Sequence, residues 1–165
     1  MKKINLLFGV GDVLDTHTNI NPFATKEQLE EFGSKIIRDD IFNLDKYVDN
    51  SEANEILAYD VIDYIPLDRH EEVIENWVGK IRIGGRIVIG GTDLFEVCKS
   101  FSQYKIGSSE ANELIHGSQE KPYLIKKLTH TALGMSEHLK NKFNLKIKKK
   151  RISGYKMIVE AERPL

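Results

Sequence analysis

The pattern of hydrophobic and polar positions predicts short strands that alternate with helices. Apolar runs of about four to six residues, bounded by Gly, Pro or Asp, are typical of buried strands. Such runs lie at residues 4–8, 17–21, 35–38, 55–59, 86–89, 145–151 and 156–161. Gly84-Gly85 predicts a turn just before the fifth run, and Ser153-Gly154 predicts a tight hairpin between the last two.

Apolar side chains spaced three and four residues apart predict helices between these strands. Asp68 and Glu71 have the spacing of a capping box, ahead of an apolar face whose Trp77 we expect in the core. Thr92 can cap the next helix, which is expected to bury Leu94, Val97, Cys98 and Phe101. Further helical segments are predicted at residues 26–32 and 133–143.

This alternation, ended by a hairpin, predicts an α/β fold. We expect a doubly wound, seven-stranded, mostly parallel sheet with helices on both faces and a C-terminal antiparallel hairpin. No internal repeat, low-complexity tract or linker divides the chain, so residues 1–165 are expected to form a single domain.

Composition narrows the class of protein. The chain has 165 residues, of which 41% are hydrophobic and 30% are charged. This composition is too apolar for a disordered chain and too polar for a membrane protein. No secretory signal and no run of about 18 apolar residues is visible, so no membrane association is expected. One cysteine, Cys98, excludes an intrachain disulfide and fits a cytoplasmic location. The five histidines lack zinc-site spacing, so no metal site is predicted.

Charge is unevenly distributed although the net charge is only −1. Residues 39–75 contain twelve acidic and two basic residues, whereas residues 121–165 contain twelve basic and three acidic residues. Such asymmetry can mark a nucleic-acid-binding face, here residues 142–151, or two parts of one domain that attract each other. We expect nucleic-acid binding to be unlikely, because the acidic segment offsets the basic one within a small domain.

Ligands of open α/β sheets bind beyond the carboxyl ends of the strands. Gly9-Val10-Gly11 follows the first predicted strand, and glycine lets a ligand approach the backbone closely. Leu14 stands where the dinucleotide fingerprint needs a third glycine, and no phosphate-binding loop with its Gly-Lys-Ser/Thr ending occurs. Nicotinamide and nucleoside-triphosphate cofactors are therefore disfavoured.

Several segments, in order along nearly the whole chain, are similar to the motifs of class I S-adenosylmethionine-dependent methyltransferases. The resemblance is greatest to small members encoded with polysaccharide or glycan biosynthesis genes. The matching segments are Leu6–Gly11, Thr18–Asn21, Arg38–Ile41, Glu55–Ile65, Ile81–Ile89, Glu113–Gly117, Thr129-His130 and Val159–Pro164.

The resemblance implies that the chain binds S-adenosylmethionine. Gly9 and Gly11 would pass beside the amino-acid part of the cofactor, and Asn21 stands where the family has an acid for the ribose. Asp40 would accept the adenine amino group while Ile41 packs on the ring. The other expected cofactor-binding residues are Phe8, Tyr59 and Asp60.

The expected reaction is direct in-line methyl transfer to a small-molecule or sugar acceptor. The sequence lacks the Pro-Pro motif of base-amine methylation and a nucleophilic cysteine after the fourth strand. The candidate catalytic residues are Asp63, Tyr64 and His130, with His130 as general base because free histidine has a pKa of about 6.5.

Two alternatives stay open. The chain could keep the fold as a binding or regulatory module without transfer activity, since Asn21, Asp60 and Tyr64 depart from the family pattern. It could also be a nucleic-acid-binding protein that uses residues 142–151.

Overall fold

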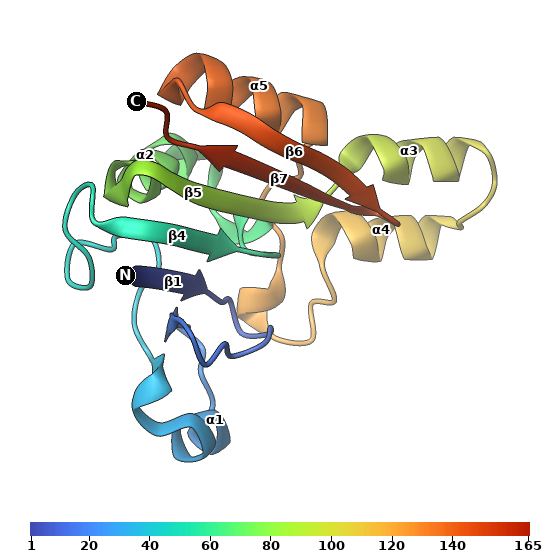
Figure 1. Cartoon of the computed structure of the whole chain (residues 1–165). Coiled ribbons are helices and arrows are strands. Elements are labelled where there is room, and N and C mark those ends of the chain that lie inside the picture. The colour runs from blue at the N-terminus through green and yellow to red at the C-terminus, as the bar shows by residue number, and fades with distance from the viewer.

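The structure, a computed structural model that describes residues 1–165, contains one seven-stranded sheet (Figure 1). The strand order is β3-β2-β1-β4-β5-β7-β6, and only β7 runs antiparallel to its neighbours β5 and β6. The strands are β1 (Lys2–Leu6), β2 (Thr18–Ile20), β3 (Ile36–Ile37), β4 (Ala53–Ala58), β5 (Ile81–Thr92), β6 (Lys146–Ser153) and β7 (Lys156–Glu162). The helices are α1 (Lys26–Phe32), α2 (His70–Lys80), α3 (Leu94–Ser102), α4 (Ser108–His116) and α5 (Ala132–Phe143). The predicted fold class and closing hairpin are confirmed.

The main core lies between the sheet and the two helices α2 and α5, which lie behind the strands in Figure 1. Alternate strand residues point to this face, as the buried Ile4, Ile56 and Ile87 show. Trp77 of α2 is fully buried among them, as its helical spacing predicts. No helix is long and apolar enough to cross a membrane.

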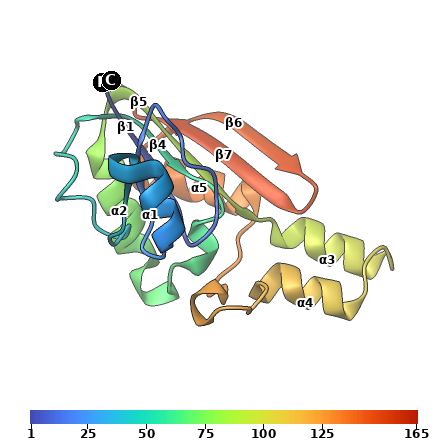
Figure 2. The same cartoon turned by 90° about the horizontal axis from the view of Figure 1, so that it is seen from below.

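The opposite face carries a helix only at one edge. There α1 packs Leu29 and Phe32 against a small cluster that contains Leu7 and Ile36. The connection between β1 and β2, residues 7–17, contains no helix, because Gly9 and Gly11 have φ angles of +79° and +122°, which no helix accommodates. Figures 1 and 2 accordingly show β4, β5 and β7 without a helix across their front. The prediction of helices on both faces holds only beside β2 and β3.

A charged network stands on this uncovered face. Glu55 of β4 is only 5% exposed. Its carboxylate contacts His17 Nε2 at 2.9 Å, Lys3 Nζ at 3.7 Å and the guanidinium of Arg86. These partners lower the pKa of Glu55 against the opposing effect of burial, which is the largest single influence. The network replaces the apolar contacts that a covering helix would make.

Helices α3 and α4 form a hairpin that extends beyond the carboxyl end of β5 (Figures 1 and 2). The sequence did not predict α4. Asp93 caps α3, not the expected Thr92, because the Asp93 carboxylate accepts the Glu96 N–H at 3.0 Å. Of the four side chains expected to be buried, only Val97 is, while Cys98 and Phe101 are exposed. The hairpin stands away from the sheet and has just one packed side.

Two local predictions were wrong. The expected capping box at Asp68 does not form, because Leu67–Arg69 is a 3₁₀ turn and α2 begins after it, at His70. Gly84-Gly85 makes no separate turn before a strand: β5 runs through it, with a register shift opposite β4 between Ala53 and Glu55. Gly84 has a φ of +74°, which allows this irregularity inside the strand.

Candidate functional site

Asn21 connects the carboxyl ends of β1 and β2. Its side chain is fully buried, and Oδ1 accepts the Gly9 N–H at 2.9 Å and the Phe23 N–H at 3.1 Å. The Asn21 amide therefore holds the glycine turn, residues 9–11, against the end of β2. The Asn21 Nδ2 atom is buried without a hydrogen-bond partner. A buried hydrogen-bond donor without a partner costs free energy, and an acceptor oxygen placed beside Nδ2 would remove that cost.

Four aromatic rings pack together at this edge of the sheet. Phe8 stacks on Tyr64, with ring centroids 4.8 Å apart, and meets Phe23 edge-on at 4.9 Å. Phe23 in turn stacks on Tyr123 at 3.9 Å and 6°. Tyr123 belongs to the segment between α4 and α5 that we call the strap, residues 117–128. The predicted site residues Phe8 and Tyr64 are thus in direct contact, beside two aromatic residues, Phe23 and Tyr123, that the sequence did not single out.

Gly9 is needed for this packing. A Cβ atom at this position would lie 2.7 Å from Cε2 of Tyr123 and 3.5 Å from a methyl group of Leu124. Because such an approach is too close for a side chain, only glycine lets the strap lie on the backbone after β1. The glycine turn therefore faces the strap.

The two acids after β3 differ in what they contact. Asp39 accepts hydrogen bonds from the Tyr47 hydroxyl and from Lys46 Nζ, the latter at 3.1 Å. Tyr47 above all, followed by the Asp40 backbone N–H and by Lys46, lowers the pKa of Asp39 to about 2. Asp40 is exposed, and its Oδ1 accepts the Phe42 N–H at 3.0 Å. Asp40 therefore presents the more accessible carboxylate.

Ile41 lies in the core, not on the surface. Its side chain is fully buried, and its carbonyl accepts the indole N–H of Trp77 at 2.7 Å. Ile41 therefore fixes the position of Asp40 but exposes no surface on which an adenine ring could pack in this conformation.

The remaining predicted cofactor residues lie on the other side of the β1–β2 connection. Gly11, Tyr59 and Asp60 line a cavity of about 280 Å³ beside the uncovered face of the sheet. Asp60 has a φ of +52° and accepts from Lys156 Nζ at 2.5 Å. The structure thus separates these three from Phe8 and Asn21.

Asp63 fastens the strap. Its side chain is 1% exposed, its Oδ2 accepts the Thr92 N–H at 2.9 Å, and Lys126 Nζ lies 3.4 Å away. Its backbone carbonyl accepts the N–H groups of Lys127 and Leu128 at 2.7 and 3.1 Å. Burial raises the pKa of Asp63. These contacts hold the strap against Asp63, whose catalytic role stays a prediction.

A cavity of about 480 Å³ lies between α4, the strap and Tyr64. Small-molecule sites commonly have volumes of about 300–1,000 Å³. Burial raises the pKa of Tyr64. Lys126 Nζ contacts Thr92 Oγ1 at 2.5 Å and the Leu114 carbonyl at 3.0 Å. The lining residues are Val10, Tyr64, Glu110, Glu113, Leu114, Gly117, Ser118, Glu120, Leu124 and Lys126.

His130 does not line this cavity. Its Nε2 lies 3.0 Å from Nε2 of His70, and the ring of His138 is close to that of His70. Burial above all, then His70 and His138, lowers the pKa of His130 to about 4. His130 therefore lies outside this cavity, its Nε2 is paired and its basicity is reduced, and its role as general base stays a prediction.

The histidine cluster predicts a loss of stability in acid. Burial also lowers the pKa of His70, so both rings prefer to be neutral in the folded chain. Folding stability from these groups is present above the unfolded pKa of about 6.5 and is lost as the pH falls toward about 4. We expect a loss of about 2–3 kcal/mol from His130 between pH 7.5 and 4.5.

Urea unfolding at the two pH values measures this loss. His130→Gln should lose less stability on acidification than the unmodified chain, because the titrating ring is absent. His116→Gln, which removes an exposed histidine outside the cluster, serves as the control. An equal loss in all three proteins would contradict the assignment.

No protein-family model and no curated protein matches the sequence. Solved structures do match it. An O-methyltransferase family protein from Burkholderia thailandensis is 12% identical with a TM-score of 0.60, over 99% of this chain and 51% of that one. A methyltransferase from Archaeoglobus fulgidus that depends on S-adenosylmethionine is 10% identical with a TM-score of 0.59, over 98% of this chain and 86% of that one.

A third structure carries bound molecules. The 1,6-didemethyltoxoflavin-N1-methyltransferase of Burkholderia thailandensis, with 1,6-didemethyltoxoflavin and S-adenosylhomocysteine, is 10% identical with a TM-score of 0.61. The match covers 98% of this chain and 71% of that one. The chain has a Rossmann-like methyltransferase fold. It spans about half the length of the Burkholderia O-methyltransferase family protein.

Within this methyltransferase fold, the four packed aromatic rings and the strap lie at the carboxyl ends of β1, β2 and β4. This is the edge at which ligands of open α/β sheets bind. The expected resemblance to members of glycan gene clusters stays a prediction, because identities of 10–12% support the fold alone.

Proposed function

We propose that the chain binds S-adenosylmethionine at the carboxyl ends of β1, β2 and β3. The observation that carries the proposal is the contact between the glycine turn and Asn21, whose buried Nδ2 has no partner, at this edge of a methyltransferase fold. A structural neighbour with S-adenosylhomocysteine bound supports it.

The residues present fit the cofactor in type. Asn21 Nδ2 can donate to a ribose hydroxyl oxygen, which would satisfy the atom left unpaired. Asp40 can accept from the adenine amino group with the oxygen that faces solvent. Gly9 leaves the backbone after β1 free of a side chain at the point of closest approach.

We place the methyl acceptor beside Tyr64 and α4, on the side of the cavity of about 480 Å³ that does not belong to the strap. The bound cofactor would supply an electrophilic methyl group on a sulfonium. The chain would hold the acceptor in line with it, and alignment of this kind supplies much of the rate of such a reaction. Glu110 and Glu113 of α4 line this side of the cavity, which suits a small polar acceptor such as a sugar.

Cofactor affinity should depend on Asp40 much more than on Asp39. Asp40→Ala is expected to weaken binding of S-adenosylhomocysteine by about ten- to a hundredfold, because a charged acceptor for the adenine amino group is lost. Asp39→Asn is the matched control, since Asp39 is engaged by Tyr47 and Lys46. Isothermal titration calorimetry measures both, and equal effects would place the adenine elsewhere.

A second candidate function is a binding module without methyl transfer. The packing of Tyr123 on Gly9 and Phe23 favours it, because these rings occupy the edge that a cofactor needs. No binding of S-adenosylhomocysteine by the unmodified, folded chain at concentrations up to about millimolar would support this candidate over the enzyme.

A further inference from the structure

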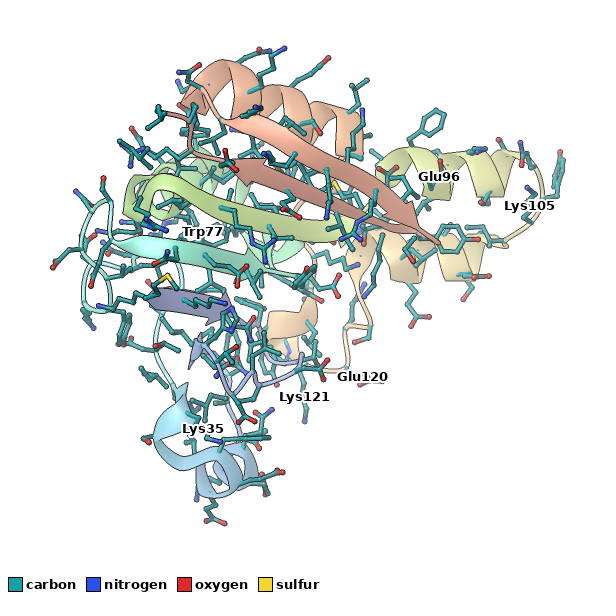
Figure 3. The ribbon with its side chains drawn as sticks, in the orientation of Figure 1. Lys35, Trp77, Glu96, Lys105, Glu120 and Lys121 are labelled. Carbon is teal, nitrogen blue, oxygen red and sulfur yellow. The ribbon has the colours of Figure 1, made fainter.

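We propose that the strap, residues 117–128, is an autoinhibitory cover over the cofactor-binding edge, and that Tyr123 must leave before S-adenosylmethionine can enter. This inference rests on the proposed function and adds a closed state to it. The strap follows α4 and crosses the ends of β1 and β2, and Figure 3 marks its exposed part at Glu120 and Lys121.

The position of Tyr123 conflicts with a bound cofactor. Its ring lies on the Gly9 backbone, where a single added carbon would be only 2.7 Å from it. The face of the ring is stacked on Phe23, with ring centroids 3.9 Å apart and 6° between the planes, so no third ring fits between them. A flat adenosyl group fits neither between the two rings nor between Tyr123 and the glycine turn.

The strap is held in a way that suits movement. It begins at Gly117, which has a φ of +83° and can act as a hinge at the end of α4. It ends at a polar latch, where Lys127 and Leu128 donate to the Asp63 carbonyl and Lys126 Nζ lies near the Asp63 carboxylate. Only Tyr123 and Leu124 insert apolar groups between hinge and latch, and residues 118–121 are exposed.

The closed state also leaves a hydrogen bond unmade. Asn21 Nδ2 lies buried and without a partner while the strap is closed. A closed core would normally satisfy this donor. The cofactor's ribose can supply the missing acceptor, so binding would provide a hydrogen bond that the closed state lacks.

Removing the ring should therefore strengthen binding. If most molecules are closed, the apparent dissociation constant is the intrinsic one divided by the open fraction. We expect Tyr123→Ala to bind S-adenosylhomocysteine about tenfold more tightly than the unmodified chain, because the stack that favours closure is lost. Tyr123→Phe keeps the stack and should bind within about twofold of the unmodified chain.

Hydrogen exchange on the unmodified chain provides a second readout. Saturating S-adenosylhomocysteine should speed exchange at the amides of Lys126, Lys127 and Leu128, whose bonds to His116 and Asp63 hold the strap closed. This measurement decides the matter if Tyr123→Ala does not fold.

The outcomes separate the two proposals. Equal affinity in all three proteins, with unchanged or slower exchange in the strap, would overturn the cover and leave the proposed function standing. No binding of S-adenosylhomocysteine to any of the three would overturn the proposed function, and the cover with it. Tighter binding by Tyr123→Ala alone, with faster strap exchange on binding, supports both.

Discussion

Replacing Trp77 by alanine is expected to lower the free energy of unfolding by about 3–5 kcal/mol. The indole is fully buried between α2 and the sheet, so its removal leaves a cavity. It also removes the donor that the Ile41 carbonyl accepts at 2.7 Å. Urea unfolding followed by circular dichroism measures the change, since the only tryptophan is lost.

The same substitution tests how the connection after β3, which contains Asp40, is held in place. Trp77 and Asn76 of α2 both bond to the connection after β3, Asn76 through the Leu44 N–H at 2.9 Å. Trp77→Phe keeps an aromatic ring but not the donor, and should cost about 1–3 kcal/mol. Trp77→Ala should also weaken S-adenosylhomocysteine binding, because Asp40 directly precedes Ile41. A loss of stability below about 1 kcal/mol for Trp77→Ala would contradict the assigned packing.

The strands and the core face were predictable because each shows a local pattern. The continuous apolar run of β4, the alternation at β7 and the spacing that buries Trp77 follow directly from the residue order. Phe101 shows the same helical spacing as a core residue but is exposed. Its helix leaves the sheet, and where a helix stands relative to the sheet is a tertiary property that spacing does not encode.

The absence of a helix between β1 and β2 has a local cause. Gly9 and Gly11 allow a close approach to the backbone, and their positive φ angles also prevent a helix from starting there. With no helix over β4, the carboxylate of Glu55 needs partners from three different segments. None of these pairings has a sequence signature.

The site could be predicted in part. The position of Asn21 and Asp40 could be predicted because both follow predicted strands, which share one edge of a parallel sheet. The sequence does not single out Tyr123, because its partners Gly9 and Phe23 lie about a hundred residues earlier in the chain. The sequence gives only the unperturbed pKa of His130, whereas burial beside His70 lowers this pKa in the folded chain.

Asp93 is expected to be the most important helix cap of the chain. Its carboxylate is 2% exposed and serves two helices at once. One oxygen accepts the Glu96 N–H of α3 at 3.0 Å, and the other accepts the Ala132 N–H of α5 at 2.8 Å. Both are among the unpaired donors of a helix N-terminus, where a carboxylate is also favoured by the helix dipole.

Asp93→Ala should therefore lower the free energy of unfolding by about 2–4 kcal/mol, twice the usual cost of one lost cap. Thr131→Ala removes only the bond to the Gly134 N–H at 3.0 Å and should cost about 1 kcal/mol. Urea unfolding compares the two. Because α3 and α4 lead directly into the strap, Asp93→Ala should also speed hydrogen exchange at Lys126 and Lys127, whereas Thr131→Ala should not. Equal destabilisation by the two variants would show that the Asp93 carboxylate caps one helix at most.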